Sequence, residues 1–202
     1  MDVDELENAL SGSLAWRKQE LQQARFLAEQ ATEISRAYLC RAWILVMYAH
    51  CDQYIKEASK LYLAHLVDYP RNSFDYWSIW QAFRAKELML NGSDGPNYDN
   101  VLKPRDIDKS ILIEALSHKT VLDSGNFKYE RLRFVCNFVL QIDFDCVVYK
   151  GFCTTLKTKR DEIAHGEQSY VSQFSDCVDW HEPTLSLLDG LTDAVLQTAR
   201  IT

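Results

Sequence analysis

Glycine and proline are scarce in this chain, and their scarcity limits what it can fold into. The 202 residues include only 7 Gly and 4 Pro. A sandwich or barrel needs a turn about every 8–12 residues, and turn signals at that density are missing here. We therefore expect long helices and an all-α fold.

Apolar residues recur in steps of three and four along most of the chain, which is the spacing of amphipathic helices. The expected helices cover residues of about 5–35, 36–68, 73–90, a short stretch after Asp108, 126–141, 145–166 and 183 to the end. The second is the longest, and Pro70 ends it. Asn91-Gly92 stops the third, and residues 91–105 are the clearest loop.

The spacing also predicts which side chains face the core. In the first helix they are Leu14, Leu21, Ala24, Leu27, Ala28, Ala31 and Ile34. In the second they are Trp43, Met47, His50, Tyr54, Ala58 and Leu61. The later stripes are Leu132, Val135, Cys136, Val139 and Leu140; then Val148, Phe152, Leu156 and Ile163; then Leu185, Leu188, Leu191, Val195 and Ala199. We expect the aromatic cluster of residues 74–83 in the core rather than stacked on bases.

The chain gives no sign of a second domain, of export or of a membrane span. No flexible Gly/Ser tract or internal repeat divides it, so residues 1–202 are expected to form a single domain. The acidic N-terminus is unlike a signal peptide, and the most apolar stretch, residues 38–49, is a dozen long and contains Arg41. We expect a cytoplasmic protein.

The six cysteines show no CxxC spacing and no histidine at zinc-finger distance. In a cytosolic chain such cysteines stay reduced, so we interpret them as small core residues. The sequence predicts no metal site and no cofactor.

The net charge of −7 would argue against a nucleic-acid-binding protein if it were spread evenly. It is not. Residues 1–35 carry net −4 and residues 176–202 carry net −4, so residues 36–175 carry net +1. The acidity lies in the terminal segments, and a near-neutral centre does not exclude an RNA substrate.

A charged segment near the end of the helix expected at 145–166 carries the groups of a metal-free phosphodiesterase. It reads Lys159-Arg-Asp-Glu-Ile-Ala-His-Gly-Glu167 and contains Arg160, Asp161 and His165. RNA can be cut by its own 2′-OH, which needs a base, an acid and a cation for the transition-state charge. Histidine serves as base or acid near neutral pH, and arginine binds phosphate with a planar fork.

This segment resembles the R-x(4–6)-H signature of the HEPN superfamily (higher eukaryotes and prokaryotes nucleotide-binding), in which a polar residue follows the arginine. The run from Tyr48 to Ala58, YAHCDQYIKEA, is similar to the second helix of a stand-alone bacterial branch of about this length. Cys51 stands where that branch usually has an aromatic residue, and Asp52 where it often has Glu. A related toxin group has Tyr where this chain has Glu167, so regulation through that Tyr is not carried over.

The resemblance implies an all-α bundle of HEPN type, with a long second helix, that forms a homodimer. Arg160 and His165 of both chains would face one cleft and cut RNA without a metal ion, with Asp161 orienting the arginine or the substrate. Such proteins act as toxins or antiviral defence effectors, and an antitoxin or regulatory protein is a possible partner.

The motif imposes a geometric condition. Five residues along a regular helix leave Arg160 and His165 about 140° apart, so they do not share a face. Gly166 is a typical residue just past a helix end, and we expect the helix to end at His165, where a loosened last turn could swing the imidazole inward. A dimer cleft would also accommodate Arg160 on its apolar stripe.

Other residues carry two readings. His50 and Asp52 could be auxiliary groups, but a core histidine and an Asp52–Lys56 pair at i,i+4 explain them as well. Lys157 and Lys159 could bind substrate phosphates or simply form a solvated face. The alternative to a nuclease is a non-catalytic HEPN module that binds nucleotide, RNA or protein; a further alternative is a helical scaffold with an accidental motif.

Overall fold

The computed structural model describes residues 1–76, 79, 112, 126–167 and 171–201. The α-helices are α1 (Val3–Glu29), α2 (Glu33–Asp68), α7 (Tyr129–Phe134), α8 (Lys150–Ala164) and α9 (His181–Arg200). Shorter turns are the π-helix η1 (Val135–Leu140) and the 3₁₀ segments η2 (Cys146–Tyr149), η3 (Phe174–Asp176) and η4 (Val178–Trp180). These ranges contain no strand, and the predicted all-α fold class is confirmed.

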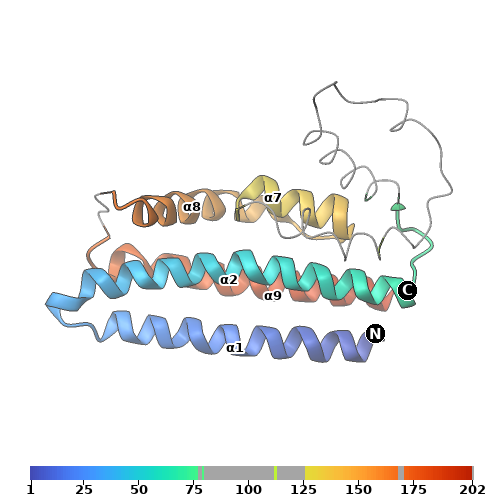
Figure 1. The fold of residues 1–202 in the computed structure, drawn as a ribbon, viewed down its shortest axis with the longest axis horizontal. Coiled ribbons are helices and arrows are strands. Elements are labelled where there is room, and N and C mark those ends of the chain that lie inside the picture. Colours follow the sequence, from blue (N-terminus) through green and yellow to red (C-terminus); the bar gives the residue numbers. More distant parts are fainter. Residues whose placement is uncertain (77–78, 80–111, 113–125, 168–170, 202) are drawn as a thin grey trace, which may run out of the picture.

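The helices form three layers (Figure 1). The middle layer is α2 beside α9, with α1 below it and α7 and α8 above it. Both chain ends lie at the same end of the bundle, where Arg200 donates to Glu7 at 2.5 Å and the terminal amino group of Met1 bonds to Asp68. Because α8 rests on α2, the charged segment of α8 sits against a helix that the core holds on its other sides.

The first two helices meet earlier than the sequence pattern predicts. Asp2 opens α1 with a capping box: its carboxylate accepts from the Glu5 N–H at 2.8 Å, and its own N–H donates to the Glu5 carboxylate. Thr32, in extended conformation, is the N-cap of α2. Ile34 therefore belongs to α2, where it is 97% exposed, and its place on the first stripe was wrong, as was that of Leu27, which is exposed on α1.

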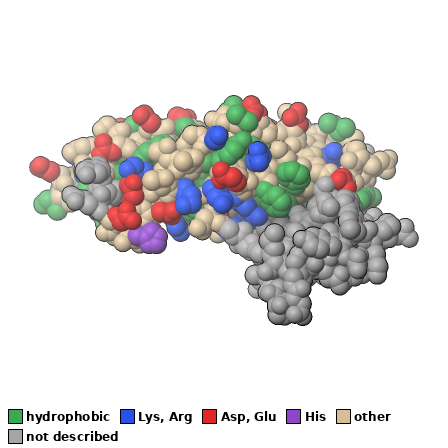
Figure 2. Space-filling model, turned by 90° about the horizontal axis from the view of Figure 1, so that it is seen from above, with side chains coloured by type: hydrophobic (Ala, Val, Ile, Leu, Met, Phe, Trp, Pro, Cys, Tyr) green, Lys and Arg blue, Asp and Glu red, His purple; other side chains and the backbone are tan. Residues whose placement is uncertain are grey.

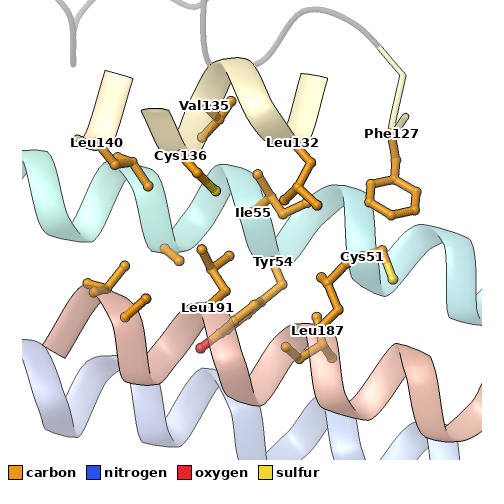
Figure 3. Close-up of a cluster of buried hydrophobic side chains, with 14 of the residues drawn as sticks. Cys51, Tyr54, Ile55, Phe127, Leu132, Val135, Cys136, Leu140, Leu187 and Leu191 are labelled. Carbon is orange, nitrogen blue, oxygen red and sulfur yellow. The ribbon is translucent and has the colours of Figure 1, made fainter. Parts of the chain in front are cut away.

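The long second helix is confirmed and buries side chains on several sides. It has 36 residues, which corresponds to about 54 Å. Of its predicted seam, all residues but Leu61, which is half-buried, are buried. Figure 3 shows Ile55 of α2 below Leu132 of α7, with Leu187 and Leu191 of α9 on the opposite side. The two neighbouring layers thus share α2 as their common core element.

The helix expected at 126–141 has the predicted buried residues but not a uniform winding. It is α-helical only to Phe134 and continues as the π-helix η1, and Gln141 then ends it in the left-handed region with φ of 52°. All five residues of its predicted stripe are buried. A π-segment is wider than an α-helix and rare, and nothing in the apolar spacing distinguishes the two.

The helix expected at 145–166 begins with a 3₁₀ segment, which changes its inward face. Asp145 accepts from the Val147 N–H at 3.0 Å and starts η2; α8 follows. Three residues per turn instead of 3.6 rotate the register. Val148 is therefore exposed and its prediction as a core residue was wrong, while Cys146, Cys153 and Leu156 are buried.

The cysteine prediction is confirmed, since all six cysteines are free and buried. Of the aromatic cluster, Phe74 is buried and Tyr76 packs against the core. Tyr76 and Ile79 are helical. The rest of the helix expected at 73–90, the loop at 91–105 and the short helix after Asp108 lie outside the described residues. No helix among those described is long and apolar enough to cross a membrane.

His181 provides a test of this packing, because it is buried at the start of α9 with its ring centroid 5.4 Å from that of Trp43. Burial lowers the pKa of His181, and Arg25 lowers it further, while Glu182 opposes them. The unfolded chain takes up a proton near pH 6.5 and the folded chain resists it, so stability falls as pH drops below that value. We expect His181→Phe to lose less stability than the parent between pH 7.5 and 5.5 in urea unfolding. Equal losses would contradict this role for His181.

Candidate functional site

The site lies where the second half of α8 crosses α2. Cys153 and Leu156 of α8 are buried in the core, and the charged residues that follow them, from Lys157 to Glu162, are only partly buried. The Lys157 ammonium donates to Oδ2 of Asp161 at 2.5 Å, and the Arg160 guanidinium donates to Oδ1 of the same carboxylate at 2.9 Å. Asp161 thus bridges two cations.

This double contact determines the charge of Asp161. The hydrogen bond from Lys157 is the largest effect on the pKa of Asp161 and lowers it; burial opposes this, and the hydrogen bond from Arg160 lowers the pKa further. The carboxylate is therefore ionised at neutral pH. It orients Arg160 through one oxygen and retains Lys157 through the other.

Tyr48 of α2 forms the floor beneath Arg160. The guanidinium carbon lies 4.9 Å from the centroid of the Tyr48 ring, within cation–π distance. Tyr48 is buried, and its hydroxyl donates to the Phe127 carbonyl at 3.3 Å. Burial, and next the charge of Asp52, raise the pKa of Tyr48 to about 12, so the phenol stays neutral and its ring remains a good cation platform.

Asp52 is one turn along α2 from Tyr48. Its carboxylate accepts from the Lys56 ammonium at 2.6 Å, and both side chains are largely buried. The i,i+4 pair expected as the simpler reading of Asp52 is therefore present. Asp52 is close enough to influence Tyr48 electrostatically, so it borders the site from the α2 side.

His50 lies elsewhere. It is buried between α1 and α2, with Nε2 2.9 Å from Oε2 of Glu20 and its ring 5.2 Å from that of Trp16. Burial lowers its pKa, and the Glu20 charge acts in the opposite direction. The structure thus does not bring His50 together with Arg160, and its position matches the core or interface reading.

The end of α8 has the predicted form. His165 is the C-cap residue that follows Ala164, the last residue of α8, and Gly166 comes next with φ of 70°. The Gly166 N–H donates to Ile163 O at 3.2 Å and the Glu167 N–H to Glu162 O at 2.9 Å, which together make a Schellman motif. The His165 side chain is exposed rather than turned inward, so in a single chain the expected inward swing does not occur.

Within one chain, Arg160, Asp161 and Lys157 lie together, whereas His165 stands apart at the end of α8. Arg160, Asp161 and Lys157 are joined by the hydrogen bonds above, while Lys159 pairs with Glu162 at 2.9 Å. Within the described part of the chain, no hydrogen bond or ion pair joins His165 to Arg160. Figure 2 shows Lys and Arg side chains gathered in the middle of this face, with acidic side chains between them and a histidine toward its edge.

The sequence pattern includes Tyr48 in the run that resembles the second helix of the family, but it does not predict that Tyr48 belongs to the site. A signal was available, since Tyr48 and Asp52 are four residues apart and thus share one face of α2. That this face would meet α8 depends on tertiary packing. In the ranges that the structure covers, no group of three or more His, Cys, Asp or Glu side chains is placed to hold a metal ion.

The arrangement can bind a phosphate at the Arg160 fork, but it needs a histidine from elsewhere to supply proton transfer beside it.

The family model described as MAE_28990-like HEPN matches residues 6–201. No curated protein and no solved structure matches the chain.

The helix end that presents His165 can be tested with a pair of glycine variants. Gly166→Ala forces a side chain into the left-handed region, and we expect it to lower the free energy of unfolding by about 1 kcal/mol. Gly151→Ala lies in the first turn of the same helix with nothing within 4 Å of the new Cβ, so it should be neutral or stabilising. Urea unfolding measures both. An unchanged stability of Gly166→Ala would contradict the observed helix end.

Proposed function

Because this chain belongs to the HEPN superfamily, we propose that it is an endoribonuclease that cuts RNA without a metal ion. The observation that carries the proposal is the Arg160 guanidinium, held between Asp161 and the Tyr48 ring with part of its surface exposed. A charge fixed in this way is suited to a phosphate oxygen.

The proposed reaction is attack of a ribose 2′-OH on the adjacent phosphorus, with release of the 5′-oxygen. His165 takes the proton from the 2′-OH while water protonates the leaving 5′-oxygen, or His165 protonates that oxygen while water takes the first proton. Arg160 stabilises the added negative charge on the phosphate, and the product is a 2′,3′-cyclic phosphate. Asp161 keeps the guanidinium in position, and Lys157 and Lys159 are candidates for neighbouring phosphates.

The proposed site is shared by two copies of the chain. Support comes from the geometry of α8: Arg160 and His165 are about 140° apart around the helix, and His165 points into solvent at its end. A second copy facing this surface would bring its own histidine to Arg160. A homodimer would thus bring together in one cleft an arginine and a histidine that lie apart in a single chain.

As a biological role we propose a toxin or antiviral effector that acts in the cytoplasm and is restrained by an antitoxin or another regulatory protein. The acidic terminal segments each carry net −4, so they repel the RNA backbone and keep nonspecific binding of RNA weak. Activity would then depend on a shaped cleft rather than on overall charge.

A non-catalytic module that binds nucleotide, RNA or protein is the second candidate. One observation favours it: Arg160 already has two partners within its own chain, Asp161 and Tyr48, as a purely structural arginine would. Cleavage assays separate the two candidates.

We expect Arg160→Ala and His165→Ala each to lower the rate of RNA cleavage in EDTA by about 10²–10⁴-fold, because each removes a group that acts in the transition state. Arg200→Ala, whose side chain pairs with Glu7 away from α8, is the matched control. The measurement is the appearance of RNA ends bearing a cyclic phosphate. If both variants cut RNA as fast as the control, the assigned roles are wrong.

The shared cleft predicts that the purified chain sediments as a dimer at micromolar concentration. If catalytic residues come from both copies, mixing Arg160→Ala with His165→Ala protein should restore part of the activity, because mixed dimers contain one intact pair. Sedimentation as a monomer, with full activity, would exclude the composite cleft.

A further inference from the structure

Two cations outside the motif are held by one aromatic ring. The guanidinium carbon of Arg133 on α7 lies 5.9 Å from the centroid of the Tyr129 ring, and the Lys150 ammonium at the start of α8 lies 5.6 Å from it. Arg133 and Lys150 are both exposed. The helices α7 and α8 thus each bring one positive charge to the Tyr129 ring at the surface.

These two cations differ from those of the motif in their partners. Lys157, Lys159 and Arg160 each donate to a carboxylate of their own helix. In the described part of the chain, neither Arg133 nor Lys150 forms an ion pair. An incoming phosphate would therefore displace no carboxylate of the described residues at Arg133 and Lys150.

A second cation–aromatic group lies on the same helix. Arg131 lies 5.9 Å from the centroid of the Phe134 ring, and Phe134 stacks on Phe138 with 6.0 Å between centroids and 25° between planes. Phe138 is 52% exposed. The Phe138 ring therefore presents apolar surface to solvent, and it stacks on the same Phe134 ring that Arg131 contacts.

The upper layer thus carries two places where cations lie on aromatic rings. Figure 2 looks down on this layer and shows hydrophobic and basic side chains next to each other across its middle. Single-stranded nucleic acid is bound in this way, with backbone phosphates on Lys and Arg and bases stacked on aromatic rings.

We propose that this face binds single-stranded RNA, with phosphates on Arg133 and Lys150 and a base on Phe138. The proposal rests on the proposed function and adds the place where the substrate is held. Lys150 and Arg160 are ten residues apart on α8, about 15 Å along the helix axis. A strand of a few nucleotides bound at the aromatic face reaches the motif.

The test uses a chain carrying His165→Ala, so that RNA is not consumed, and a fluorescent 20-nucleotide oligouridine in an anisotropy titration at several salt concentrations. Adding Arg133→Ala and Lys150→Ala removes two phosphate contacts. For single strands, the slope of log affinity against log salt should become less steep by about 1.4. A matched double variant, Lys18→Ala with Arg200→Ala, removes two cations that are paired with Asp189 and Glu7, and its slope should stay that of the parent.

Phe138→Ala separates stacking from charge. We expect about tenfold weaker binding at fixed salt and an unchanged salt slope, because the ring carries no charge. Thermal unfolding of each variant, followed by circular dichroism, verifies that the helices persist, which their exposed side chains favour.

The proposal is overturned if the Arg133/Lys150 variant keeps the parent's salt slope, or if the parent does not bind oligouridine at all. A chain that binds with the expected slopes but never cleaves RNA would instead remove the proposed catalysis and leave the binding face in place. The two proposals therefore fail on different measurements.

Discussion

Burial of α2 on opposite sides is the constraint on which the rest of the structure depends. Trp43, Tyr54 and Tyr62 are among its fully buried large side chains, and α1, α8 and α9 all pack on this one helix. Truncating a buried aromatic residue typically costs about 3–5 kcal/mol, a large part of the stability of a domain this size. Because Tyr48 and Asp52 belong to α2, the core fixes the floor under Arg160.

Much of the fold could be predicted from sequence because it depends on period and helix ends. The stripe from Leu132 to Leu140 and the end of α8 just before Gly166, with His165 as its C-cap, follow from local rules and are confirmed. Ile34 and Val148 were misplaced because Thr32 caps a new helix and a 3₁₀ turn precedes α8. Each shift rotates a helix by a fraction of a turn, which apolar spacing alone does not record.

The sequence names candidate site residues, and their contacts come from the structure. The motif identified Arg160, Asp161 and His165 by type and spacing, and the i,i+4 rule supplied the Asp52–Lys56 pair. The stacking of Arg160 on Tyr48 joins residues more than a hundred positions apart. It depends on how α8 crosses α2, and no local pattern encodes that crossing.

The cations of the upper layer differ in their partners, and this difference gives the motif and the aromatic face different roles in the two proposals. At the motif each of these cations pairs with a carboxylate, so a phosphate reaching Arg160 must compete with Asp161. Part-exposed ion pairs of this kind contribute only about 0–1 kcal/mol, so the competition is modest. At Arg133 and Lys150 no carboxylate competes within the described residues. In these proposals the affinity for RNA comes from the aromatic face, and the ion-paired residues of the motif contact only a phosphate of the strand that is bound there.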